Sequence, residues 1–90
     1  MTAEKFLLMA ADSTHLVIKG EKILKEQGID CRIIPLPSQI KASCGLSIRT
    51  VEENLLKVKG IFQENEIVMD FYLVEKMGLK KNFIKLQELL

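Results

Sequence analysis

Cys44 is the residue of this chain whose type and surroundings fit covalent chemistry best. It follows Lys41 and Ser43 and precedes Gly45, in a polar loop that opens with Pro35-Leu36-Pro37. Cysteines packed among apolar residues are usually inert, but this stretch holds too few apolar neighbours to bury the thiol. Gly45 places no side chain beside the sulfur, so a thiol or backbone of another molecule can approach. The segment therefore fits a reactive thiol, and an ordinary loop cysteine stays open as the alternative.

Composition limits the other functions. Ninety residues fit a single domain, and thirteen Lys and Arg against twelve Asp and Glu give a net charge of only +1. Such a balance, with four Phe, one Tyr and no Trp, argues against nucleic acid as a partner. No metal-ligand spacing, glycine-rich phosphate loop or membrane-length apolar stretch occurs, so neither a metal, a cofactor nor a membrane is expected. The start of the chain lacks a secretion-signal pattern, which favours a cytoplasmic protein with free thiols.

Hydrophobic periodicity predicts four strands and two helices in the order β-α-β-β-α-β. A capping box of Thr50 and Glu53 is expected to open the second helix. Gly20 falls on the packed face of the first helix, where it lets that helix approach the sheet closely. The expected strands cover 5–11, 31–36, 46–49 and 67–74, and the expected helices cover 15–27 and 51–65.

This order is typical of an α+β ferredoxin-like sandwich, in which two helices cover one face of a four-stranded antiparallel sheet. We expect a single ferredoxin-like domain over residues 1–75. Residues 76–90 form an amphipathic extension, in which the spacing of Phe83, Leu86 and Leu90 predicts a short helix.

The predicted topology brings Cys44 to the start of the first helix. The loops after the first and second strands leave the sheet at the same end, and the first of these loops contains Ser13, Thr14 and His15. Helix amides and nearby cations favour a thiolate. His15 is therefore either a proton partner of Cys44 or a solvated helix residue, and Lys41 has the same two alternatives.

Cys31 has the opposite expected role. It begins the second strand at the far end of the sheet, about 17 Å from the Cys44 loop at ~3.3 Å per residue. A disulfide needs Cα atoms within about 7 Å, so we expect no internal bridge and a structural Cys31. A reactive Cys44 then has to exchange its cargo with another molecule.

Three segments of the chain resemble a small family described as putative selenium/sulfur carrier protein-like. They are 13–15 with 20–25, 33–37, and the cysteine-glycine segment 43–49, and the resemblance covers about residues 5–75. It implies a carrier rather than a turnover enzyme. Sulfur or selenium would be accepted from a donor protein as a persulfide or selenosulfide on Cys44 and passed to an acceptor protein. The loop reads Ser38-Gln39-Ile40-Lys41 where the family often carries an arginine or an acidic residue.

Two functional hypotheses follow from the sequence. In the first, Cys44 is the carrier thiol, supported by Gly45, His15, Ser13, Thr14, Lys41 and Ser43. In the second, the chain is a dimeric ferredoxin-like binding or regulatory module without covalent chemistry, because this architecture hosts many unrelated functions. A homodimer is compatible with both.

Overall fold

The computed structural model describes residues 4–41 and 44–86, which form an α+β structure of five strands and two α-helices. A single 3₁₀ turn, η1, precedes the second helix. The elements are β1 (Glu4–Ala10), α1 (Thr14–Glu26), β2 (Cys31–Pro35), β3 (Leu46–Thr50), η1 (Glu52–Asn54), α2 (Leu55–Glu64), β4 (Asp70–Met77) and β5 (Lys80–Leu86).

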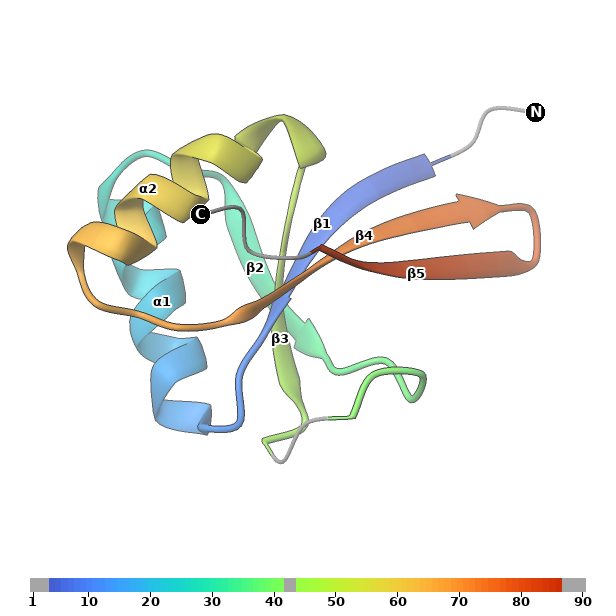
Figure 1. The fold of residues 1–90 in the computed structure, drawn as a ribbon, viewed down its shortest axis with the longest axis horizontal. Helices are drawn as coiled ribbons and strands as arrows, with labels where there is room; N and C mark the ends of the chain where they lie inside the picture. The colour runs from blue at the N-terminus through green and yellow to red at the C-terminus, as the bar shows by residue number, and fades with distance from the viewer. Residues whose placement is uncertain (1–3, 42–43, 87–90) are drawn as a thin grey trace.

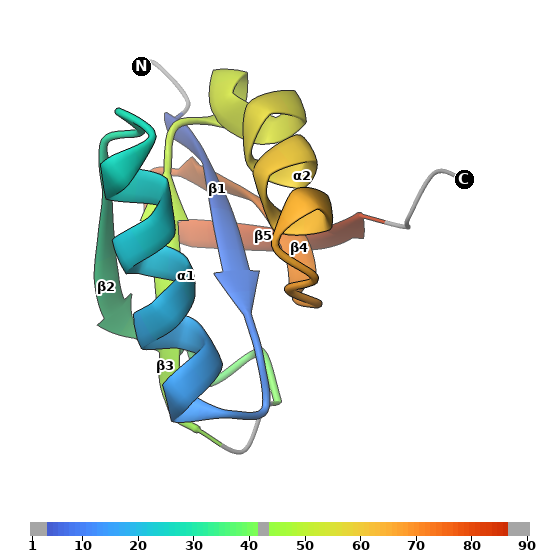
Figure 2. The ribbon, with the colours of Figure 1, turned by 90° about the vertical axis from the view of Figure 1, so that its left-hand side faces the viewer.

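The strands form one antiparallel sheet in the order β2-β3-β1-β4-β5. Both helices lie on the same face of this sheet, and the β4–β5 hairpin extends away from them (Figures 1 and 2). The central strand β1 is apolar on both faces, from Phe6 to Ala10, because side chains cover it on both sides. Neither helix in the described ranges is long and apolar enough to span a bilayer.

A fifth strand replaces the predicted C-terminal helix, so the prediction of four strands with an extra helix was wrong. Lys80–Leu86 pairs with β4 across the two-residue turn Gly78-Leu79. The spacing of Phe83 and Leu86 suited a helix, but Phe83 lies opposite Val74 and packs on it in the sheet. Leu90 lies outside the described residues. Lysines along β5 keep this edge strand charged.

Thr50 does not cap α2, contrary to the predicted capping box. It ends β3, where its hydroxyl donates to Asp30 O (2.8 Å) and accepts from Asn54 Nδ2 (3.0 Å). Val51 and η1 then intervene before α2 begins at Leu55. The side chain of Thr50 therefore ties β3 to the start of β2, and β4 likewise begins at Asp70 rather than at Ile67.

The main core lies between the helices and the sheet, and α1 packs closely on it at Gly20, where an added Cβ would lie 3.4 Å from Ile48 Cδ1 of β3. A Cβ built on Gly20 would lie 2.7 Å from Met69 Cε and 3.3 Å from Phe62 Cζ. The predicted role of this glycine is thus confirmed. Twelve buried residues make up this core: Leu7, Met9, Ala11, Val17, Leu24, Ile29, Cys31, Ile48, Val58, Phe62, Ile67 and Met69.

Gly20→Leu should lower the free energy of unfolding by about 1–3 kcal/mol, because no space exists for the side chain against Phe62 and Met69. Gly60→Ala in α2 is the matched control, since nothing lies within 4 Å of its added Cβ. That change should raise stability by about 0.5–1 kcal/mol. Urea denaturation of both variants measures the difference, and a Gly20→Leu protein as stable as wild type would contradict the close approach.

The other face of the sheet is covered in part by the β2–β3 loop. Ile40 of this loop is buried, and it packs in a second cluster with Phe6, Leu8, Ala10 and Val74. The loop therefore does not project freely into solvent. The loop crosses this face of the sheet before the chain reaches Cys44.

Candidate functional site

Cys44 lies at the end of the sheet where β1 leaves for α1. Its Sγ is 3.0 Å from the carbonyl oxygen of Ala11 and 3.3 Å from that of Leu46, and it accepts a hydrogen bond from the Leu46 N–H at 3.4 Å. Ala11 follows β1 directly and lies two residues before Ser13. The thiol is thus held against the β1–α1 connection, at the same end of the sheet as the start of α1.

Gly45 closes the β2–β3 loop beside the thiol. Its carbonyl oxygen accepts a 2.9 Å hydrogen bond from Leu36 N, which joins the two ends of the loop. Its φ of +70° lies in the left-handed region that side chains disfavour, and a Cβ there would face open space. The backbone conformation therefore calls for glycine at this position, and among the described residues no atom outside its chain neighbours lies close to where a Cβ would be.

The Cys44 side chain is half-buried, although its stretch of sequence holds too few apolar neighbours to bury the thiol. It packs at the margin of the main core. Most residues of this core come from parts of the sequence far from Cys44, which a local count could not include. Part of the Cys44 side chain therefore remains exposed.

The helix-start residues lie near this end and form no hydrogen bond with the thiol. Ser13 is the N-cap of α1, and its hydroxyl accepts from Leu16 N at 3.4 Å. Thr14 begins α1, and both it and His15 are exposed. Within the described ranges, the hydrogen-bond partners of Cys44 Sγ are backbone groups, and neither alternative given for His15 is decided by them.

Of the two loop residues predicted to support the thiol, Lys41 is exposed and forms no ion pair with the described residues. Ser43 lies outside the described residues. No group of three or more His, Cys, Asp or Glu within ranges 4–41 and 44–86 could hold a metal ion.

Cys31 is buried at the start of β2, at the opposite end of the strand from the Cys44 loop. Its Sγ approaches Glu21 O at 4.0 Å, and both cysteines are free thiols. Burial, with a smaller contribution from the Glu21 carboxylate, raises the pKa of the Cys31 thiol. The predicted structural placement of Cys31 is thus confirmed.

In the folded protein, Cys44 should react with iodoacetamide at least about tenfold faster than Cys31, since burial and a raised pKa both suppress attack by Cys31. Brief alkylation at neutral pH followed by peptide mapping measures both rates. Labelling in urea is the control, because unfolding should remove most of the difference. Equal rates in the folded protein would contradict the placement of the two thiols.

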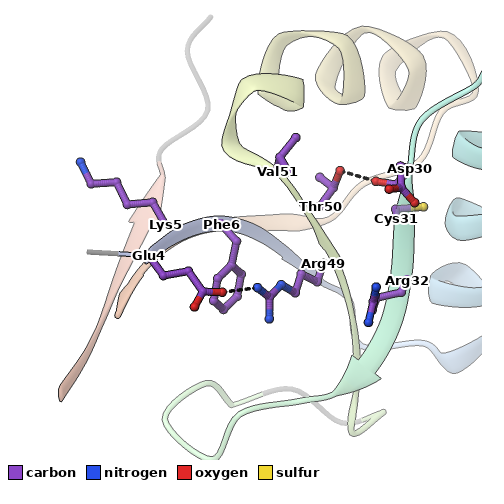
Figure 3. A pocket seen from close by; sticks show the side chains of 9 residues that line it. All are labelled: Glu4, Lys5, Phe6, Asp30, Cys31, Arg32, Arg49, Thr50 and Val51. Carbon is purple, nitrogen blue, oxygen red and sulfur yellow. Dashed lines mark hydrogen bonds and ion pairs between the residues drawn. The ribbon is translucent and has the colours of Figure 1, made fainter. Parts of the chain in front are cut away.

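Sequence reasoning assigned no role to the opposite end of the sheet, where β1 and β2 begin and β3 ends. There a hollow of about 450 Å³ contains Arg32 and Arg49, with Arg49 ion-paired to Glu4 and lying 3.9 Å from the ring centroid of Phe6 (Figure 3). The sequence feature that could have revealed this hollow is the alternation of side chains within β2 and β3, which places Arg32 and Arg49 on the same face of the sheet.

Comparison with protein families identifies the chain. The family model described as "Putative Se/S carrier protein-like" matches residues 6–73. The chain belongs to this family. The match confirms the resemblance seen in the sequence and includes both cysteines, whereas β5 lies beyond it. Nothing matches in the comparisons with curated proteins and with solved structures.

Proposed function

We propose that the protein carries sulfur or selenium on Cys44, as a persulfide or selenosulfide, between a donor protein and an acceptor protein. The observation that carries this proposal is the difference in exposure between the two thiols. The chain also belongs to a family described as carrier-like. Cys44 is partly exposed beside Gly45, while Cys31 is buried and its pKa is raised.

Loading needs no external oxidant. The Cys44 thiolate attacks the terminal sulfur of a donor persulfide, R–S–SH, so that a new S–S bond forms and the donor leaves as the thiolate R–S⁻. A donor carrying R–S–SeH delivers selenium by the same exchange. In delivery, an acceptor thiolate attacks the terminal atom and Cys44 leaves as a thiolate. The proton lost from Cys44 on loading returns to it after delivery.

The surroundings of Sγ suggest how the thiol and thiolate states of Cys44 differ in their hydrogen bonds. The thiol of Cys44 donates to a carbonyl, with Ala11 O nearest at 3.0 Å, and the thiolate cannot make that bond. The Leu46 N–H can still donate to the sulfur after deprotonation. We infer that donor docking turns Sγ away from Ala11 toward solvent. In this proposal Ser13, Thr14, His15, Lys41 and Ser43 support the exchange by contacting the donor.

The carrier proposal includes a ferredoxin-like arrangement of residues 1–75, with 76–90 as an extension of that domain. It is supported by the element order up to β4 and by the strand order β2-β3-β1-β4. In this arrangement the β1–α1 and β2–β3 connections lie at the same end of the sheet. The donor and acceptor would therefore meet the protein at one surface, in the cytoplasm.

The proposal is tested by loading the protein with glutathione persulfide and removing the excess by gel filtration. Treatment with cyanide then releases bound sulfane sulfur as thiocyanate, which is measured by its iron complex. We expect about one equivalent of thiocyanate per chain, and none when the loaded protein is first treated with dithiothreitol. A loaded sample that yields no thiocyanate would refute the carrier function.

The alternative is a dimeric binding or regulatory module without covalent chemistry. It is favoured by the contact of Sγ with backbone carbonyls and by the hollow at the far end of the sheet. The alternative predicts that the protein yields no thiocyanate in this assay. The same experiment therefore separates the two functions.

A further inference from the structure

The charges of the protein are divided between its two layers, although the whole chain has a net charge of only +1. The strands and the β2–β3 loop, at 4–11, 31–41, 44–50 and 70–86, carry eight Lys and Arg against three Asp and Glu, a net of +5. The helical layer, at 12–30 and 51–69, carries five Lys against eight Asp and Glu, a net of −3. Glu88, outside the described residues, accounts for the remaining charge. Overall composition hides this separation, which leaves the layer of strands and the β2–β3 loop with a positive charge.

Two cross-strand pairs on the helix-free face place like charges directly opposite each other. Arg32 lies opposite Arg49 across β2 and β3, and Lys76 lies opposite Lys81 across β4 and β5. Arg49 also lies opposite Leu8, which belongs to the cluster on this face. Like-charge pairs in this position destabilise a sheet. Glu4, which lies opposite Lys76 and is ion-paired with Arg49, offsets part of the repulsion, and a bound anion would relieve more of it.

Each like-charge pair lines a hollow of about 450 Å³, and the two hollows adjoin at Glu4, Phe6 and Arg49. In Figure 3 the guanidinium of Arg49 points toward Glu4, between that carboxylate and Arg32. The second hollow lies between the β2–β3 loop and the β4–β5 hairpin. Its lining includes one carboxylate, Glu4, against three cations, and Glu4 is already paired with Arg49.

The second hollow also has apolar walls. Ile34 and Leu36 form one side and Phe83 another, while Phe6 lies beneath the Arg49 guanidinium. Its volume is in the range of sites for small organic ligands, about 300–1,000 Å³. Cations beside an apolar wall suit a ligand that has both a phosphate and an apolar or flat organic group.

We propose that these adjoining hollows on the helix-free face bind a small organic phosphate, with its phosphate groups on Arg49, Lys76 and Lys81 and its organic part against Phe83 and the β2–β3 loop. Arg32 lines the first hollow only, where it provides a further cation for a second anionic group of the ligand. The first hollow lies at the opposite end of the sheet from Cys44, whereas the second reaches the β2–β3 loop, whose Leu36 N–H donates to the Gly45 carbonyl. The proposed site does not depend on the carrier chemistry.

A nucleic-acid strand fits this face less well than a small ligand does. Binding successive bases requires several exposed aromatic rings on the central strands. Here Phe6 is only 8% exposed beneath Arg49, and Leu8 is fully buried. The β2–β3 loop covers the centre of the face through Ile40, which leaves a cleft rather than an open platform.

The proposal is tested by NMR titration of ¹⁵N-labelled protein with pyrophosphate, ADP, adenosine and a single-stranded oligonucleotide. Pyrophosphate and ADP should shift the amide signals of residues lining the hollows, with ADP binding more tightly because of its organic part. Adenosine should bind at least about tenfold more weakly than ADP, and binding of ADP should weaken with salt. If neither phosphate compound shifts these signals, or if the oligonucleotide binds more tightly than ADP, the proposal is wrong.

A double variant, Lys76→Gln with Lys81→Gln, provides a second readout at exposed positions. It should weaken ADP binding by at least about tenfold and, without ligand at low salt, raise the melting temperature slightly by removing the repulsion. The matched control, Lys19→Gln with Lys57→Gln, removes the same charge from the helical layer and should change affinity less than about twofold. Equal losses of ADP affinity in the two double variants would overturn the proposed site.

Discussion

Cys44→Ser is expected to abolish sulfur loading, reducing the thiocyanate yield from about one equivalent per chain to background. A serine hydroxyl is not ionised at neutral pH and does not exchange with a persulfide, so the acceptor atom is lost. The folded structure should be retained, because the side chain is half-buried at the margin of the core. Cyanolysis measures the loading, and circular dichroism checks the fold.

Cys31→Ser is the matched control for that result. Cys31 is 6% exposed and does not contact Cys44, so loading should remain near one equivalent per chain. Its stability should fall by about 1–3 kcal/mol, because a hydroxyl then replaces a thiol in the core. Loading that is lost in Cys31→Ser and kept in Cys44→Ser would reverse the assigned roles of the two thiols.

Phe62→Ala should lower the free energy of unfolding by about 3–5 kcal/mol, a large share of the stability of a small domain. Phe62 is 2% exposed, and its ring packs against Phe71 at a centroid distance of 6.1 Å. It also lies under Gly20, where α1 and α2 meet the sheet. Removing the ring leaves a cavity that these backbone elements cannot fill.

Leu56→Ala on the same helix is the control, since that side chain is 81% exposed. Its effect should stay within about 0.5 kcal/mol. Urea denaturation followed by circular dichroism compares the two variants. Equal destabilisation would contradict the orientation of α2 on the sheet.

The sequence was sufficient for the type and order of the elements from β1 to α2, because their apolar patterns are strong, but not for the residue at which α2 begins. The end of the chain was mispredicted because Phe83 and Leu86 fit a helix as well as a strand by spacing alone. The deciding feature was long-range: Gly78-Leu79 forms a two-residue hairpin turn, and β4 offers a partner for 80–86. Thr50 also fitted a capping box locally, but its hydroxyl bonds Asp30, twenty residues away in sequence.

For the candidate site, the sequence was sufficient to predict that Cys44 lies at the same end of the sheet as the start of α1. It did not predict the contacts of the thiol. The carbonyl of Ala11 and the apolar residues that half-bury the thiol come from segments that local composition does not include. The basic hollows were missed for a related reason. A net charge of +1 averages over two layers of opposite sign, and only the strand register shows which charges face each other.

Intact-mass spectrometry of the wild-type protein tests the central claim most directly. The protein is incubated with glutathione persulfide, freed of excess reagent, and measured before and after dithiothreitol, with peptide mapping to locate any addition. The account predicts a gain equal to one sulfur atom, located on the peptide that contains Cys44 and removed by dithiothreitol. An unchanged mass, or an addition located on Cys31, would contradict it.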